Sequence, residues 1–163
     1  MDPLPKSGEE QFDIAIQFDG TWTHQGTPMT RMPLVRLFAG IMTRDAAGDY
    51  WLVTPVERGR IDVADAPFIV VGWRQDGGTL YLNDNLGREA AVDAAHPLWL
   101  RTPRGVDGPK VPYHQLGGGI EARLNTSVYY DLVELALASG GPNNDGCLSI
   151  ASAGTAHPLG VLP

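Results

Sequence analysis

The sequence predicts an α+β fold made mostly of antiparallel sheet, divided into two small related domains with one main helix each. The chain has 20 glycines and 13 prolines among 163 residues, and these residues are disfavoured inside helices and common between strands. Hydrophobic residues make up 43% of the chain and charged residues 19%, a balance typical of folded proteins rather than disordered ones. Short apolar segments separated by turn-forming residues therefore indicate many short strands.

The first domain is expected over residues 1–61. Apolar and polar residues alternate over 12–18, which predicts a strand with one buried face, and the Asp-Gly pair that follows is a hairpin signal leading to a return strand. Helical spacing of apolar residues begins at a proline, a residue that suits the first helical turn. The expected elements after the first strand are a strand over 21–25, a helix over 33–42, a strand over 50–53 and an extended segment over 56–61.

The second domain is expected over residues 62–163, beginning with a meander of strands. Asn125, Thr126 or Ser127 can cap a helix that ends near Ala138, before a Gly-Gly-Pro stop. Two strands after the helix form a final hairpin. The expected strands are 67–73, 79–83, 88–93, 98–101, 111–116, 120–124, 147–151 and 155–159.

Two short sequences recur within the chain. Leu-Val-x-Leu occurs at 34–37 and again at 132–135, each time in a predicted helix, which suggests a duplication; coincidence is the alternative. Ala-His-Pro-Leu occurs at 95–98 and at 156–159. The second recurrence does not fit the spacing of the first and has no explanation at this level.

Charge and cysteine content exclude several classes of protein. Twelve basic residues against nineteen acidic residues give a net charge of −7, which opposes binding to a nucleic acid polymer. The single Cys147 allows neither an intramolecular disulfide nor a cysteine zinc site. The longest apolar run, 68–73, is too short to cross a bilayer, and the first ten residues lack a signal-peptide core. A cytoplasmic protein without membrane association is expected.

The segment 54–61 is the main candidate site. If it is extended, Arg58 and Arg60 project from one face and Glu57 from the other. Between Arg31 and Arg60 the chain carries five arginines against three acidic residues, a locally basic region in an acidic protein. Two guanidinium groups on one face suit a phosphate or a carboxylate; the alternative is that these charges are solvated or paired within the protein.

No other motif identifies a reaction. The four histidines show no metal-ligand spacing, no cofactor-binding or catalytic signature occurs, and Gly117–Gly119 is expected to be a flexible hairpin loop. Trp22 and Tyr113 could stack on a base, although aromatic residues in predicted strands are usually core residues. The sequence therefore predicts no cofactor and no metal site, and an enzyme is the third interpretation.

Several motifs are similar to those of a bacterial family, the domain-of-unknown-function family 1285. They are Asp19-Gly20-Thr21-Trp22, Tyr50-Trp51-Leu52-Val53-Thr54-Pro55-Val56-Glu57, Tyr129-Tyr130-Asp131-Leu132-Val133-Glu134-Leu135-Ala136 and His157-Pro158-Leu159-Gly160. The resemblance implies a duplicated α+β core whose second domain loosely resembles a pleckstrin-homology fold. It also implies a groove between the domains for a nucleotide-like ligand and a role in signalling. The family has no established catalytic activity, so the resemblance implies no catalytic residues. Family members often have lysine at Arg58, which keeps the charge and changes the donor geometry.

The preferred functional hypothesis is a sensory protein that binds a small anionic, nucleotide-like ligand. The alternative is a protein-interaction adaptor, or a homo-oligomer, with no small-molecule ligand. The expected ligand-binding residues are Trp22, Arg31, Arg36, Thr54, Glu57, Arg58, Arg60 and Tyr113.

Overall fold

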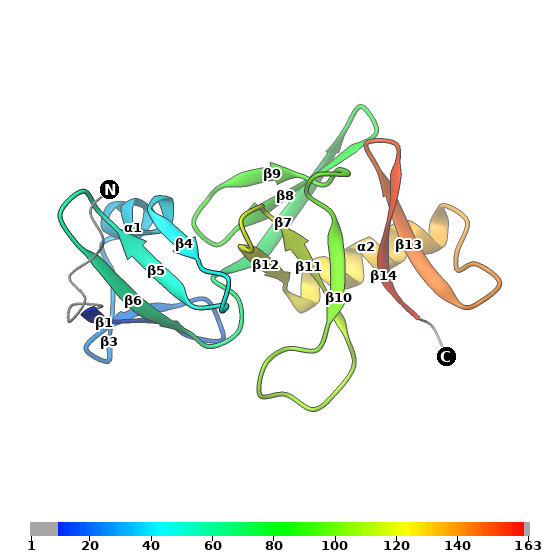
Figure 1. The fold of residues 1–163 in the computed structure, drawn as a ribbon. Coiled ribbons are helices and arrows are strands. Elements are labelled where there is room, and N and C mark those ends of the chain that lie inside the picture. Colours follow the sequence, from blue (N-terminus) through cyan, green and yellow to red (C-terminus); the bar gives the residue numbers. More distant parts are fainter. Residues whose placement is uncertain (1–9, 162–163) are drawn as a thin grey trace. The chain divides into compact units, whose positions relative to one another are not determined.

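The computed structural model describes residues 10–161, which contain two helices and fourteen strands (Figure 1). The chain forms two compact units. The first runs to Pro67 and includes Gly118–Ile120, and the second comprises Phe68–Gly117 and the residues from Glu121 onward. Two sheet-rich units with one helix each confirm the predicted fold class.

The first unit is a six-stranded sheet with one helix, as far as the structure describes it, in the order β3-β2-β1-β6-β5-β4. Only β1 and β6 pair in parallel; the other neighbours are antiparallel. Pro33 lies in the first turn of the helix, as predicted. The elements are β1 (Glu10–Ile16), β2 (Trp22–His24), β3 (Thr27–Pro28), α1 (Met32–Gly40), β4 (Met42–Arg44), β5 (Tyr50–Val53) and β6 (Arg58–Val63).

The second unit has a six-stranded sheet in the order β10-β11-β12-β7-β8-β9, together with a helix and a separate hairpin, β13–β14, in its described part. Asn125 is the cap of the helix, because its side chain accepts a hydrogen bond from the N–H of Val128 at 2.8 Å. The elements are β7 (Phe68–Asp76), β8 (Thr79–Asp84), β9 (Glu89–Ala91), β10 (Leu98–Arg101), β11 (Val111–Gln115), β12 (Glu121–Leu124), α2 (Thr126–Ala138), β13 (Cys147–Ser152) and β14 (Thr155–Val161).

The two large sheets have the same topology. Each consists of two three-stranded antiparallel meanders whose first and last strands, β1 with β6 and β7 with β12, pair in parallel at the centre. The helices occupy different places in this scheme, since α1 joins the two meanders of its sheet and α2 follows both meanders of the other. The Leu-Val-x-Leu recurrence therefore aligns helices that are not equivalent in the strand topology.

The first sheet has an apolar face and a face that carries arginines. Strand pairing places Ile16, Trp22, Tyr50, Leu52 and Ile61 on one face, and all five are at most 3% exposed. Burial of this apolar area is the main contribution to the stability of the unit.

Two details differ from the sequence-based expectation. Helix α1 ends at Gly40, and Met42, which was expected to be helical, begins strand β4 because it pairs with Leu52 and is 8% exposed. The expected boundary between residues 61 and 62 lies inside β6, which continues to Val63 and pairs with β1, so the first unit extends to Pro67.

Candidate functional site

The arginine-bearing face of the first sheet is built around Trp51. In the antiparallel pair β5–β6, Trp51 lies opposite Arg60 and Val53 lies opposite Arg58. Residues directly opposite one another share a face, as do residues two apart along a strand. Arg58 and Arg60 therefore project on the same side as Trp51, as the predicted extended conformation requires.

Both guanidinium groups lie over the same indole ring. The Cζ atom of Arg58 is 3.9 Å from the ring centroid of Trp51, and that of Arg60 is 4.9 Å away. The ring is held in place because its Nε1 donates a hydrogen bond of 2.8 Å to Oδ2 of Asp45. That hydrogen bond lowers the pKa of Asp45, so the carboxylate stays charged and continues to orient the ring. We call Trp51, Arg58 and Arg60 the arginine–indole cluster.

The two arginines of the cluster differ in their contacts. Arg60 lies 3.8 Å from Asp49, a long contact between side chains that are 40% and 45% exposed, where ion pairs are weak. The Nε atom of Arg58 is buried and has no hydrogen-bond partner among the described residues.

Arginines that stack on aromatic rings in the second unit are paired differently. Arg74 lies over Tyr81 and is 2.7 Å from Glu89. Arg88 lies over Phe68 and is 3.0 Å from Asp84, and Arg101 lies over Tyr113 and is 2.6 Å from Glu121. Stacking on an aromatic ring is thus common in this protein, and a close carboxylate accompanies it in these three cases. Arg58 stacks without a carboxylate partner in the described part of the chain.

Thr54 and Glu57 form the turn that leads into β6. The N–H of Thr54 donates to the carbonyl of Glu57 at 2.8 Å, and the Thr54 hydroxyl accepts a hydrogen bond of 3.0 Å from the N–H of Glu57. The hydroxyl is therefore engaged in the turn itself. Glu57 is exposed, next to Val56 at the tip of the turn, which is 90% exposed.

The other predicted site residues lie elsewhere. Trp22 is on the apolar face of the sheet, opposite to the arginine–indole cluster, and its Nε1 has no hydrogen-bond partner among the residues described. Arg31 is at the N-cap of α1 and Arg36 on the exposed side of that helix. Tyr113 belongs to β11 of the second unit, where it is fully buried.

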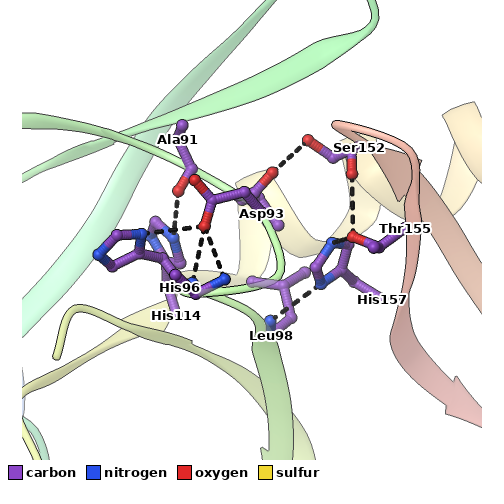
Figure 2. A network of polar contacts seen from close by, with 10 residues as sticks. Ala91, Asp93, His96, Leu98, His114, Ser152, Thr155 and His157 are labelled. Carbon is purple, nitrogen blue, oxygen red and sulfur yellow. Dashed lines mark hydrogen bonds and ion pairs between the residues drawn. The ribbon is translucent and has the colours of Figure 1, made fainter.

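A histidine network in the second unit was missed by the sequence analysis (Figure 2). Nε2 of His114 is 3.0 Å from the carbonyl oxygen of Ala91, and Nδ1 of His96 is 2.9 Å from Asp93. The third histidine, His157, receives a hydrogen bond of 3.4 Å from the N–H of Leu98. The two Ala-His-Pro-Leu segments are thus in contact. Their recurrence was the one feature of the sequence that could have pointed to this network.

Neither region resembles a metal centre. Within residues 10–161 no three His, Cys, Asp or Glu side chains are arranged to hold a metal ion. Over the same residues, neither helix has the length and apolar character needed to span a bilayer.

Comparison with known families and structures identifies relatives over both units. The family model described as "Domain of unknown function (DUF1285), N-terminal domain" matches residues 5–66, and that described as "Protein of unknown function (DUF1285), C-terminal domain" matches residues 67–159. No curated protein matches the chain.

Two solved structures of DUF1285 family proteins are similar. One, from Silicibacter pomeroyi DSS-3, is 32% identical, with a TM-score of 0.81 over 94% of this chain and 82% of the other. The other, from Shewanella baltica OS155, is 25% identical, with a TM-score of 0.60 over 78% of this chain and 94% of the other. With both of its units matched by the family models, the chain belongs to the DUF1285 family.

Proposed function

We propose that this protein is a sensory protein that binds a small anionic ligand, of nucleotide-like chemistry, through Arg58 and Arg60. The observation that carries the proposal is the pair of guanidinium groups over one indole ring, with Arg58 lacking a carboxylate partner in the described chain. Two adjacent cations repel one another, and an anion placed between their donor groups would relieve that repulsion.

The geometry suits a phosphate group. A guanidinium group offers planar, paired N–H donors that bind phosphate oxygens in bidentate fashion. Trp51 and Asp45 hold one side of the cluster in a fixed position, so little conformational entropy is lost when the arginines bind a ligand. Charge-assisted hydrogen bonds of this kind each contribute about 1.5–3 kcal/mol.

The proposal is tested by isothermal titration calorimetry with AMP, adenosine and inorganic phosphate. Binding of AMP and phosphate, with none of adenosine, is expected. Arg58→Ala should weaken binding about 10- to 100-fold, the equivalent of one or two charge-assisted hydrogen bonds.

Arg74→Ala is the matched control. It removes one positive charge and one stacked guanidinium group, but from an arginine that is already paired with Glu89 in the other unit. It should leave the affinity for AMP unchanged. Equal loss in both variants, or no heat with any of the anions, would contradict the proposal.

We include a cytoplasmic location in this proposal. With a single cysteine, Cys147, the chain forms no internal disulfide, in keeping with a reducing compartment.

A second candidate function, a protein-interaction adaptor, is favoured by Trp99. This side chain is 60% exposed on β10, and an exposed aromatic side chain can anchor a contact with a protein partner. This function would be favoured over the first by a protein partner that binds the wild-type protein and not Trp99→Ala, together with calorimetric titrations that show no binding of anions.

A further inference from the structure

The β13–β14 hairpin is tied to the main sheet of the second unit through His157 (Figure 2). The ring is 2% exposed. Its Nδ1 accepts a hydrogen bond of 3.4 Å from the N–H of Leu98, the first residue of β10. Its Nε2 is 2.7 Å from the hydroxyl of Thr155. The Thr155 hydroxyl in turn donates to the carbonyl of Ser152 at 3.1 Å. The chain of hydrogen bonds therefore runs from β10 across the ring into the hairpin turn.

These partners determine the protonation state of the ring. A backbone N–H can only donate, so Nδ1 must be an unprotonated acceptor. Nε2 therefore carries the hydrogen of the neutral ring and donates it to Thr155, whose own hydrogen is directed to Ser152. The complete set of hydrogen bonds exists only when His157 is uncharged.

We propose that protonation of His157 at Nδ1 loosens the β13–β14 hairpin from β10, so that the second unit contains an acid-sensitive docking contact. The added N–H would face the N–H of Leu98, two donors that cannot bond to each other. It would also place a positive charge in a buried site, which is strongly unfavourable without a partner. Solvent exposure of the hairpin relieves both costs.

The charged groups around His157 oppose part of this response. The elements packed against β14, and the segment before β10, bring these titratable or charged residues to this part of the unit: Asp93, His96, Arg101, His114, Tyr129 and Cys147. Asp93 is the nearby carboxylate, and it already bonds to the ring of His96 and to two backbone N–H groups. Arg101 is paired with Glu121, and Cys147 is at the far end of the hairpin, opposite Val161. The charge of Asp93 raises the pKa of His157 and opposes part of the acid response, but burial has the larger effect on that pKa.

The direction of the pH dependence follows from burial. Burial lowers the pKa of His157, and it also lowers the pKa of His114. In the open hairpin His157 regains an ordinary pKa of about 6.5, so the open state binds the proton more readily than the closed one. Opening is then favoured as the pH falls below about 6.5, by up to about tenfold for each pH unit per linked proton.

Ser152 supplies a second tie that does not titrate. Its hydroxyl donates to the carbonyl of Val92 at 2.6 Å and accepts from the N–H of Leu80 at 2.8 Å. The hairpin consequently remains docked most of the time in mild acid, and the expected change is in the frequency of opening.

Amide hydrogen exchange between pH 5 and pH 8, corrected for intrinsic rates, measures that frequency. Exchange of the β13–β14 amides should accelerate as the pH falls from 7 to 5, by up to about tenfold per pH unit below about pH 6.5, while β5–β6 amides of the first unit stay constant. His157→Gln, which cannot titrate, should abolish the acceleration, and His24→Gln, at the single histidine of the first unit, should preserve it.

A nitrogen NMR titration of the wild-type imidazoles provides a test that requires no variant. His157 should appear as the neutral Nε2–H tautomer with a lowered pKa. An ordinary titration near pH 6.5 with unchanged hairpin protection would overturn the proposal, as would an acid response that survives in His157→Gln.

Discussion

Replacement of Gly59 by alanine is expected to destabilise the first unit and disturb the arginine–indole cluster together. Gly59 lies between Arg58 and Arg60 in β6 and is buried. Its backbone does not adopt the left-handed conformation that favours glycine. Glycine is therefore required here because a larger side chain would not fit. A Cβ atom built at this position overlaps Cγ, Cδ2 and Cε2 of the Phe12 ring.

The size of the effect follows from this overlap. Non-bonded carbon atoms prefer separations of about 3.5–4.0 Å, so the ring or the strand must move by about 1 Å or more. The strand has little freedom, because Gly59 is flanked by Leu52 of β5 and by β1 on the other side. Forced overpacking of this kind costs about 1–3 kcal/mol of unfolding free energy.

Urea unfolding monitored by NMR peak intensities of the β5 and β6 amides follows the first unit separately. Gly40→Ala is the matched control in the same unit, since no atom lies within 4 Å of its added Cβ, and it should be neutral or stabilising by up to about 1 kcal/mol. Phe12→Ala should remove most of the cost of Gly59→Ala, with a coupling energy of about 1 kcal/mol or more. Additive single effects, or a Gly59→Ala variant as stable as the wild type, would refute the reasoning.

Three further substitutions have defined outcomes. Ser152→Ala leaves two buried backbone groups without their partner and should lower the stability of the second unit by about 1–3 kcal/mol in a urea titration; no change would mean that these two hydrogen bonds contribute nothing to stability. Asn125→Ala removes the cap of α2 and should cost about 0.5–2 kcal/mol, whereas Asn125→Ser should cost less. Trp51→Phe removes the hydrogen bond to Asp45 and should raise the pKa of that carboxyl toward its ordinary value in a carbon NMR titration; an unchanged pKa would show that the indole does not hold the carboxylate.

Local patterns in the sequence were sufficient for most elements of the fold, but not for β3 or β4. Alternation predicted β1 and a proline at the first turn predicted α1. Three neighbouring cap candidates, Asn125, Thr126 and Ser127, predicted the start of α2. Each of these signals depends on residues close together in the chain. The same reasoning failed at Met42, where pairing with Leu52 overrides a helical spacing. Long-range pairing of this kind has no local signal.

The candidate site, too, was predicted from local sequence only in part. The alternation rule placed Arg58 and Arg60 on one face from their spacing alone. It could not show that Trp51 lies beneath both of them, or that Trp22 is on the opposite face, because strand register decides both. The chemistry around Arg58 depends on that register.

By itself, the sequence determined that the chain is an acidic, turn-rich α+β protein with a basic segment at 54–61. Only the tertiary structure decided which aromatic ring those arginines cover, and that the two Ala-His-Pro-Leu segments meet through His157 and Leu98. The physical reason is that secondary structure follows from short-range propensity, whereas charge pairing, burial and imidazole tautomers depend on neighbours brought together from distant parts of the chain.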